Sequence, residues 1–510
     1  MFNIKIQFMD NSDENRNKTV KYLYGASVQG IQDFIFQTNK LKEIVGASEI
    51  VADICTTAFK EYEKNGESIV RAAGNIKHIF NNKEDCEKAA LNFPKKVMTM
   101  APGITISQAV VKLKDDLSDY KNQADNLEKL LINQRNRQVR PMTLGLMAIK
   151  RSPATGLPAV KEEDNVLIDE ASDKKEQYNA VKKLAERSFG INLTDKQIAY
   201  DIDKITGKNN WIAVIHADGN GIGNIVRAVG DDKEDMKRFS GMLDDITKIA
   251  ANAAYEKVKD KFASKVIPLR PVVLSGDDMT LICRADLAID YTKCFIEKFE
   301  KESKKQFETI VLKKTENQKL INQGLTVCAG IAFVKSSYPF HYAVHLAETL
   351  CSRAKNAAKK IDEKLAPSCL FFHKVQDSFV ENFDKIAERE LTPKPNLSFE
   401  AGPYYCGNRA MDIHKEKCTA KLDCLISGTT KLGGSSIKSH LRQWVEMLFD
   451  NIDAANQKMK RLRAVNRQAK DFDLEKYEKL NATDHVIIPF YDMLSLASIL
   501  QTETKNKKED

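Results

Sequence analysis

The feature that most constrains this chain is an internal repeat. Three short segments recur in the same order along the sequence: YGASVQGI at 24–31 as IHADGNGI at 215–222, AGNI at 73–76 as SGDD at 275–278, and GITISQ at 103–108 as GLTVCA at 324–329. None of these matches needs a gap. Strand and helix patterns alternate around them, so they predict two copies of a β-α-β-β-α-β unit, the split-βαβ or ferredoxin-like topology.

The repeat divides the chain into four parts. We expect a degenerate first copy at 1–113 and a second copy at 209–376. The segment 114–208 begins with a polar helix and continues into charged loop residues, which indicates a partly helical connector. The segment 377–510 is mainly helical by its apolar period, and its clearest helix covers 440–468. The predicted fold class is α+β, with two ferredoxin-like domains, a helical connector and a helical C-terminal domain.

Composition excludes several classes of protein. The 510 residues are 42% hydrophobic and 29% charged, which is ordinary for a folded chain of several domains. No run approaches the roughly 18 to 20 apolar residues of a membrane helix, so we expect no membrane partner. The N-terminus lacks the basic and apolar regions of a signal peptide, so we expect a cytoplasmic protein. The net charge of +8 permits a phosphate-bearing partner without requiring one.

The ten cysteines form no CxxC pair, and none lies between Cys86 and Cys283. The middle of the chain therefore carries no cysteine zinc ribbon and no disulfide framework. Four potential zinc ligands follow within 19 residues near the C-terminus: Cys406, His414, Cys418 and Cys424. Their spacings fit no common zinc pattern, so reduced thiols are the simpler interpretation.

The two copies of the repeat differ in their acidic residues. The alignment places three aspartates of the second copy on uncharged residues of the first: Asp218 on Ser27, Asp277 on Asn75, and Asp278 on Ile76. The first acid ends a strand and the other two form a hairpin turn, so a split-βαβ sheet can bring them together. Clustered carboxylates repel one another, and a cation resolves the repulsion. Their oxygens suit two Mg²⁺ or Mn²⁺ ions, which would stabilise the attacking and leaving oxygens of a displacement at phosphorus. We therefore predict that these three aspartates are catalytic and bind metal.

The neighbours of the aspartates favour a nucleotide. Gly219, Asn220 and Gly221 lie between a strand and a helix, where backbone amides can bind phosphate. Gly276 allows the hairpin to approach a ligand closely, and Lys355 can bring positive charge to a triphosphate. Each feature alone has a simpler explanation, because Asp-Gly and Gly-Asp-Asp are common in turns and most helix lysines are solvated. Their combination in one copy of a repeat favours a metal–nucleotide site.

These residues resemble the CRISPR polymerase family, the large subunit of type III CRISPR effector complexes. The resemblance covers about 20–376 and rests on these segments: 28–36 (VQGIQDFIF), 41–48 (LKEIVGAS), 217–223 (ADGNGIG), 274–279 (LSGDDM), 329–331 (AGI) and 354–355 (AK). Members of that family have two palm domains related to nucleotide cyclases. Their second palm carries a Gly-Gly-Asp-Asp turn and makes cyclic oligoadenylates from ATP.

The resemblance implies roles for individual residues. It implies metal binding by Asp218, Asp277 and Asp278, contact of Lys355 with the triphosphate, and a nucleotide against the turn at Gly276. With the segment argued above, the predicted nucleotide-binding residues are Gly219, Asn220, Gly221, Ser275, Gly276 and Lys355. It also implies ATP as substrate, two Mg²⁺ or Mn²⁺ ions, and guide or target RNA and other effector subunits as partners. A homo-oligomer is a further expectation.

Three departures from the family pattern affect the prediction. Ser275 replaces the first glycine of the turn and restricts its backbone. No His-Asp pair of a nuclease domain occurs, so we do not expect DNA cleavage. The connector segment 151–159 (RSPATGLPA) has no cysteine where the family has a zinc site. The sequence therefore resembles a shortened relative.

Three functions remain open at this stage. The first is a nucleotidyltransferase that makes a cyclic oligonucleotide, most simply cyclic oligoadenylate, in antiviral defence. The second is a scaffold subunit of an RNA-guided complex that performs no turnover, which the serine in the turn favours and the acidic cluster opposes. The third is an enzyme that makes a cyclic mono- or dinucleotide, from GTP for example.

The helix predicted at 440–468 is rich in basic residues. With the residues that follow it, it carries six: Lys458, Lys460, Arg461, Arg463, Arg467 and Lys470. Such a series is most often a solvated face, and its alternative is contact with an RNA backbone.

Overall fold

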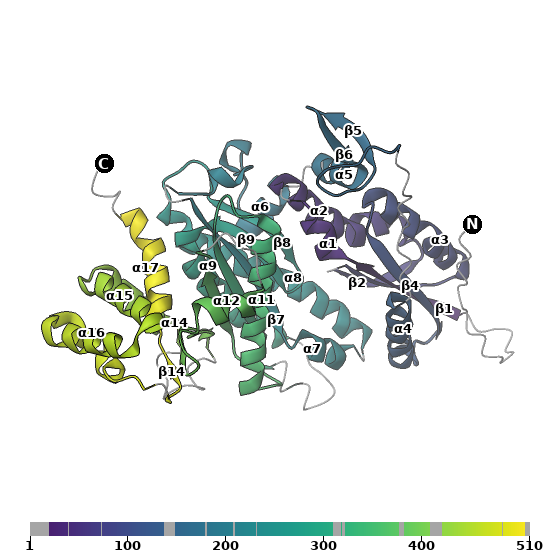
Figure 1. Ribbon diagram of the computed structural model, residues 1–510. Coiled ribbons are helices and arrows are strands. Elements are labelled where there is room, and N and C mark those ends of the chain that lie inside the picture. Colours follow the sequence, from purple (N-terminus) through teal and green to yellow (C-terminus); the bar gives the residue numbers. More distant parts are fainter. Residues whose placement is uncertain are drawn as a thin grey trace.

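The fold is described from a computed structural model of the chain. It describes residues 20–504 except for these positions: 39, 73, 137–147, 179–180, 208–209, 231, 310–317, 319–321, 377–381, 409–420 and 482. Figure 1 shows a mixed α/β molecule in which the first sheet, the second sheet and a group of C-terminal helices follow one another from one end to the other.

The first sheet has four antiparallel strands in the order β2-β3-β1-β4. Its elements along the chain are β1 (Val20–Gln29), α1 (Ile31–Phe36), α2 (Leu41–Asp53), β2 (Gly66–Ala72), β3 (Asn75–Phe80), α3 (Lys83–Met100) and β4 (Thr105–Lys114). This strand order is that of a split-βαβ unit.

The second sheet repeats this order and extends it. Its six strands run β13-β11-β10-β7-β9-β8, so β8-β9-β7-β10 corresponds to β2-β3-β1-β4. Its elements are β7 (Trp211–Asn220), α7 (Ile222–Val229), α8 (Lys233–Val258), β8 (Leu269–Ser275), β9 (Asp278–Arg284), α9 (Ala288–Phe307), β10 (Thr326–Lys335), α11 (Phe340–Ile361), β11 (Cys369–Lys374) and, from the C-terminal part, β13 (Tyr404–Tyr405). Helix α9 was not predicted from the sequence. The duplicated strand order expected from the repeat is confirmed.

The register of the hairpins corrects one part of the sequence alignment. Ala217 pairs with Met279 in the β7–β9 register, so the next pair along these antiparallel strands places Asp278 opposite Asp218. In the first sheet, Asn75 lies opposite Ser27. The structural counterpart of Asp278 is therefore Asn75, not Ile76, and that of Asp277 is the preceding glycine of the first hairpin. The sequence alignment was shifted by one residue, because it matched Gly74 of one turn to Gly276 of the other.

The two turn glycines occupy different places. Gly276 is the first residue of its two-residue turn, between Ser275 and Asp278, and has a φ of +62°. Gly74 directly precedes Asn75, and so is the last residue of the first turn, with a φ of +77°. Glycine adopts either conformation without strain, so a match between glycines does not define a hairpin register.

Helix α11 packs closely on the second sheet at Gly330. An added Cβ at Gly330 would lie 1.9 Å from the carbonyl oxygen of Ala347 and 2.4 Å from the backbone nitrogen of Cys351. Only a residue without a side chain allows α11 and β10 to come this close. The contact fixes the distance of the whole helix from the sheet, including its C-terminal half.

We expect Gly330→Ala to destabilise the second sheet by about 1–3 kcal/mol, because the added methyl group must push α11 away. Differential scanning fluorimetry should show a lower melting midpoint for the domain. Gly241→Ala is the control, since Gly241 is exposed on α8 with no atom within 4 Å of an added Cβ. That substitution should leave the midpoint unchanged or raise it, as alanine favours a helix by roughly 0.8–1.0 kcal/mol. Equal midpoints for Gly330→Ala and wild type would contradict the prediction.

The connector contains more strand than its sequence predicts. Its elements are α4 (Tyr120–Arg135), β5 (Ala159–Glu163), β6 (Val166–Asp169), α5 (Glu170–Gln177) and α6 (Val181–Phe189). Strands β5 and β6 form a hairpin in a segment expected to be charged loop. Most side chains of β5 are exposed, and β6 passes from exposed Val166 to buried Ile168 and Asp169, so neither strand shows the alternation that marks a half-buried strand.

The C-terminal part is mainly helical. Its elements are α12 (Phe383–Glu390), β12 (Leu397–Ser398), β13 (Tyr404–Tyr405), α14 (Leu422–Gly433), α15 (Ile437–Asp450), α16 (Ile452–Val465), β14 (Val486–Ile487) and α17 (Phe490–Thr504). The single helix predicted at 440–468 is wrong, because Asn451 breaks it. Asn451 has an extended backbone, and its side chain accepts a hydrogen bond from the Ala454 backbone nitrogen at 3.0 Å, so it caps α16. Helices α15 and α16 consequently pack against each other. Within the described residues, no helix has the length and apolar character needed to cross a membrane.

Candidate functional site

The alternation of β7 decides which of its side chains face α11. Ile212 and Val214 pack into the core that contains α11, whereas Ala213 and Ile215 pack into the core that contains α8 and α9. Because successive strand residues point to opposite faces, His216 and Asp218 continue the α11 side. The site therefore forms where β7 ends, beneath α11.

A histidine joins the acidic cluster predicted from the sequence. One potential ligand atom from each of His216, Asp218 and Asp278 lies within 4.8 Å of those of the other two. Asp277 lies beside them, since an added Cβ at Gly219 would be 2.9 Å from its Oδ2 atom. The three predicted aspartates thus come together from a strand end and a hairpin turn. Sequence reasoning missed His216, although its position two residues before Asp218 on a strand could have identified it.

The cluster is electrostatically strained without a cation. Burial, followed by the charge of Asp218, raises the pKa of Asp277 to about 7. Burial and the charges of Asp218 and Asp277 raise the pKa of Asp278 well above its usual range. Burial also lowers the pKa of His216 to about 4, so its imidazole is neutral at pH 7. Carboxylates with a neutral imidazole beside them form a donor set that fits a divalent cation.

Lys355 lies in the same site. Its Nζ pairs with Asp218 Oδ2 and donates a hydrogen bond to the Gly219 carbonyl oxygen at 2.9 Å. Burial opposes the charged form, but the charge of Asp218 and the bond to it outweigh burial and raise the pKa of Lys355 above its usual 10.5. Helix α11 therefore brings a permanent positive charge to the acidic cluster.

The predicted glycine-rich turn contributes mainly backbone. The side chain of Asn220 is buried and donates hydrogen bonds to Thr326 Oγ1 at 3.1 Å and to Cys328 Sγ at 3.2 Å. Its amide nitrogen is therefore bonded within the sheet, next to Cys328, the strand partner of Asp218. Gly221 precedes α7 with a φ of +70°. A contact of this segment with nucleotide would involve the backbone, and it stays a prediction.

The hairpin that carries two of the aspartates is held from behind. Thr247 on α8 donates a hydrogen bond from Oγ1 to the Gly276 carbonyl oxygen at 2.5 Å, and this bond is buried. Arg187 on α6 donates to the Leu274 carbonyl oxygen at 2.6 Å. These bonds fix the turn so that its carboxylates face β7. Ser275 is partly buried and leads into the turn from β8.

The first sheet has a cavity in the corresponding place. It has a volume of about 500 Å³, and Ser27, Asn75 and Arg135 are among its lining residues. Arg135 Nη2 donates a hydrogen bond to Ser27 Oγ at 3.2 Å. A guanidinium thus lies beside the residue that corresponds to Asp218, and the carboxylate of Asp33 also lines this cavity.

The two sheets meet at their hairpins. A small cavity of about 90 Å³ is lined by Ser275 and Asp278 of the second sheet, by Gly74 of the first, and by residues of α1 and α2. Helix α2 packs on β8, and Figure 1 shows α1 and α2 between the two sheets. The acidic cluster therefore lies close to the junction between the sheets.

Comparison with known protein families identifies this part of the chain. Residues 211–363 match the family model described as Cas10/Cmr2, second palm domain. Most of the second sheet thus lies in a segment that is similar to this palm domain. The matched range of this palm includes the whole acidic cluster and Lys355. No curated protein matches the chain by sequence.

Solved structures share the fold over nearly the whole chain. They include Csm1 of T. onnurineus, a Csm1–Csm4 subcomplex of the type III-A CRISPR-Csm interference complex, and a Csm1–Csm4 cassette in complex with cA3. Each is 12% identical in sequence, with a TM-score of 0.50; the matches cover 95%, 95% and 96% of this chain and 70% of each solved chain. At this identity the likeness concerns the fold.

The potential zinc ligands near the C-terminus are only partly described. His414 and Cys418 lie outside the described residues. Cys406 is buried and directly follows β13, and its backbone nitrogen donates a hydrogen bond to the Ser368 carbonyl oxygen at 3.1 Å.

Proposed function

We propose that this protein is a nucleotidyltransferase that makes a cyclic oligonucleotide, most simply cyclic oligoadenylate from ATP. The observation that carries the proposal is the convergence of Asp218, Asp277 and Asp278 beside Lys355, inside the segment that matches a Cas10/Cmr2 second palm. A scaffold has no need for clustered carboxylates with raised pKa values. Perturbed carboxylates of this kind are typical of functional sites.

Asp218, Asp277 and Asp278 would hold one or two divalent cations, Mg²⁺ or Mn²⁺, with His216 beside them. The fit rests on the raised pKa values of Asp277 and Asp278, since a cation relieves the repulsion that raises them. When bound, such ions lower the pKa of an attacking hydroxyl and neutralise charge on a triphosphate.

The side chains of the chain itself would position the substrate. Lys355 would bind the triphosphate, and the turn at Ser275 and Gly276 would lie against the nucleotide. The bond that forms joins a ribose 3′ oxygen to an α-phosphorus, and the bond that breaks releases pyrophosphate. The hydroxyl proton passes to solvent, so the reaction requires no dedicated protein base.

The cavity of the first sheet would hold the second nucleotide or the growing product. Arg135 supports this assignment because a guanidinium binds phosphate oxygens well. The small cavity between the two sheets links this cavity to the acidic cluster, which allows one oligonucleotide to be extended across the junction.

The proposed setting is a type III CRISPR-like complex. Csm1 with a related fold is solved in a Csm1–Csm4 cassette with cA3, and in another with pppApApA. We propose nucleoside triphosphates as ligands and CRISPR-type effector subunits with guide or target RNA as partners. A cytoplasmic location follows from that role.

The test is synthesis by the purified chain. We expect incubation with ATP and Mn²⁺ to release pyrophosphate and to yield cyclic oligoadenylates detectable by mass spectrometry. Parallel incubations with GTP distinguish a cyclic mono- or dinucleotide synthase. Activity only after RNA is added would favour regulation by an effector complex. Silence with every nucleoside triphosphate, with and without RNA, would contradict the proposal and favour the scaffold, which Ser275 in the turn also favours.

A further inference from the structure

The break at Asn451 creates a groove in the C-terminal part, between α15 and α16. One wall is a single face of α15, the other is a single face of α16, and one end is closed by the 3-10 turn Arg467–Phe472. Its volume is about 1010 Å³. The residues that line it are Ser436, His440, Gln443, Met447, Ala454, Gln457, Lys458, Arg461, Leu462, Val465, Asn466, Arg467 and Gln468. We call this the C-terminal groove.

The charge of the C-terminal groove has one sign. Lys458, Arg461 and Arg467 line it, and no carboxylate is among its lining residues. Lys458 Nζ donates to Gln443 Oε1 of the opposite helix at 2.6 Å, whereas Arg461 and Arg467 have no hydrogen bond or ion pair to any described residue. Both arginines are exposed, so they are free to bind an anion.

The opposite face of α16 is different. There Arg463 pairs with Glu478 and, at 3.0 Å, with Glu475. The neighbouring cavity, which Lys460, Arg463 and Lys470 line, also contains the carboxylates of Asp473, Glu475 and Glu478. The basic series therefore divides into a side with acidic neighbours and a side without them, and only the second side lines the groove.

We propose that the C-terminal groove binds the phosphate backbone of single-stranded nucleic acid. The lining positions of α15 run from 436 to 447, which is about 16 Å of helix axis and equals four or five phosphates of a stacked strand. A duplex, whose major groove alone is about 12 Å wide, is too broad to enter between two packed helices. The amides of Gln443, Gln457 and Asn466 add hydrogen-bond donors for phosphate and sugar oxygens.

The groove favours nucleic acid over an acidic peptide. Peptide helices dock through several apolar anchors in an apolar groove, whereas the four apolar residues of this groove share it with three cationic side chains and four side-chain amides. No Phe, Tyr or Trp lines it, and His440 is its one ring, so base stacking contributes little. Binding should therefore depend strongly on salt and weakly on base sequence. The site lies in the C-terminal helices, away from the acidic cluster, and does not depend on the proposed synthesis (Figure 1).

The experiment uses the full chain and a fluorescent oligouridylate of about 15 nucleotides, within the size range of single-strand sites. At about 50 mM salt, Arg461→Ala/Arg467→Ala should weaken binding roughly tenfold, as measured by fluorescence anisotropy. The slope of log affinity against log salt should become shallower by about 1.4, because each lost phosphate contact removes about 0.7.

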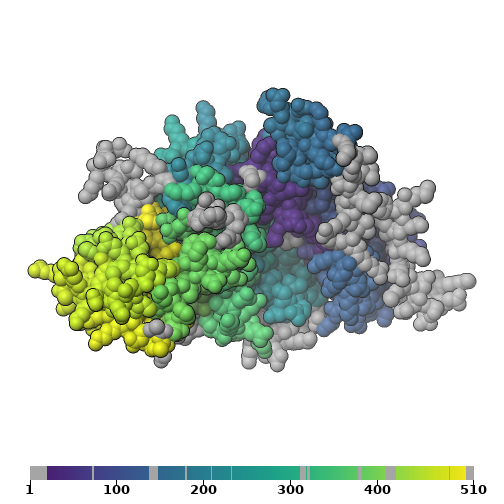
Figure 2. All heavy atoms as spheres, viewed as in Figure 1, coloured from purple at the N-terminus to yellow at the C-terminus, as the bar shows by residue number. Residues whose placement is uncertain are grey.

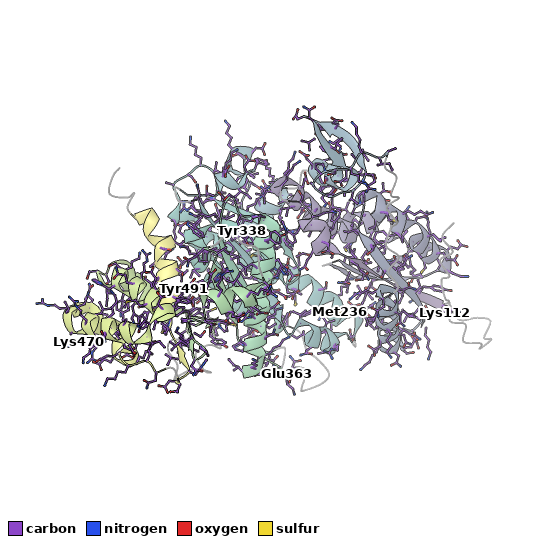
Figure 3. All side chains as sticks on the ribbon, viewed as in Figure 1. Lys112, Met236, Tyr338, Glu363, Lys470 and Tyr491 are labelled. Atoms are coloured by element: carbon purple, nitrogen blue, oxygen red, sulfur yellow. The ribbon has the colours of Figure 1, made fainter. Side chains whose placement is uncertain are left out.

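The matched control is Lys460→Ala/Lys470→Ala, which removes the same charge from exposed residues of the neighbouring cavity. Figure 3 labels Lys470 at the C-terminal end of the molecule, far from Lys112 of the first sheet. The control should bind within about twofold of wild type, because these two lysines do not line the groove and act only through the general field. Circular dichroism melts verify that both variants are folded.

Equal losses for the groove and control variants would overturn the proposal, since they would mean that overall charge alone causes binding. Failure of the folded wild type to bind the probe would also overturn it. Groove-dependent binding of polyglutamate, with no binding of the oligouridylate, would replace it with an acidic-peptide site. Groove-dependent binding of the probe by a chain that makes no nucleotide product would support it independently of the proposed function.

Discussion

The double substitution Asp277→Asn/Asp278→Asn should slow the synthesis of oligonucleotide product by about 10³-fold. Bound cations contribute several kcal/mol of transition-state stabilisation in phosphoryl and nucleotidyl transfer, and about 4 kcal/mol corresponds to a 10³-fold change in rate. Asparagine keeps the shape of each side chain but removes the charge that a cation needs. Pyrophosphate release at saturating ATP and Mn²⁺ is the measurement.

The same double variant also tests whether the loss is local. Without a cation it should melt at or above the wild-type temperature, because it removes partly buried carboxylates that repel one another. The control is Asp244→Asn/Asp245→Asn, an adjacent pair on α8 whose contacts with Lys248 are surface ion pairs worth little. It should keep the wild-type rate. A rate above a tenth of wild type in the Asp277/Asp278 variant would place the chemistry elsewhere.

The acidic cluster could be predicted from sequence because its parts are local. Asp218 lies near the end of an apolar strand, Asp277 lies in a hairpin turn, and Asp278 begins the strand that follows the turn. The repeat then supplied the topology, and the topology placed the strand end next to the turn. The period of two along β7 also contains the information that adds His216, since it shares a face with Asp218.

Long-range geometry could not be predicted in this way. The partner of Arg135 is Ser27, more than 100 positions earlier in the chain, and no local pattern links them. The direction of the Asn220 side chain depends on Thr326 and Cys328 in a neighbouring strand. The true register of the first hairpin depends on which turn position has a positive φ, and glycine permits both.

The C-terminal helices illustrate a different limit. Apolar residues continue at helical spacing through Asn451, so periodicity alone predicts one helix across it. Asparagine is tolerated inside a helix at a small cost and is strongly favoured as an N-cap, so the break depends on tertiary packing. Ala455, Met459 and Leu462 are buried only when α16 folds back. The groove exists because the helix breaks at Asn451, and only its charges could be predicted from the sequence.

The stability of the cation-free chain should fall as the pH rises from about 6 to about 8. The carboxyl of Asp277 has an ordinary pKa of 3.8 when unfolded, but burial and Asp218 raise it to about 7 in the fold. The folded state therefore holds a proton that the unfolded state has released, and this contribution to stability is lost as the pH rises through about 7. Asp278 shifts in the same direction. Thermal unfolding in the presence of a chelator measures the effect.

Mn²⁺ should reverse this loss, and its effect should be larger at about pH 8 than at about pH 6, because ligation requires ionised carboxylates. At a hundred times its dissociation constant, Mn²⁺ should stabilise the fold by about 2.7 kcal/mol.

Buried Asp492 also has a pKa raised to about 7, so part of the pH dependence of the metal-free chain arises outside the site. The Asp277→Asn/Asp278→Asn variant isolates the contribution of the acidic cluster to this pH dependence. It should keep the contribution of Asp492 and lose the response to Mn²⁺. An equal Mn²⁺ response at both pH values, or in that variant, would mean that the cation binds at another place.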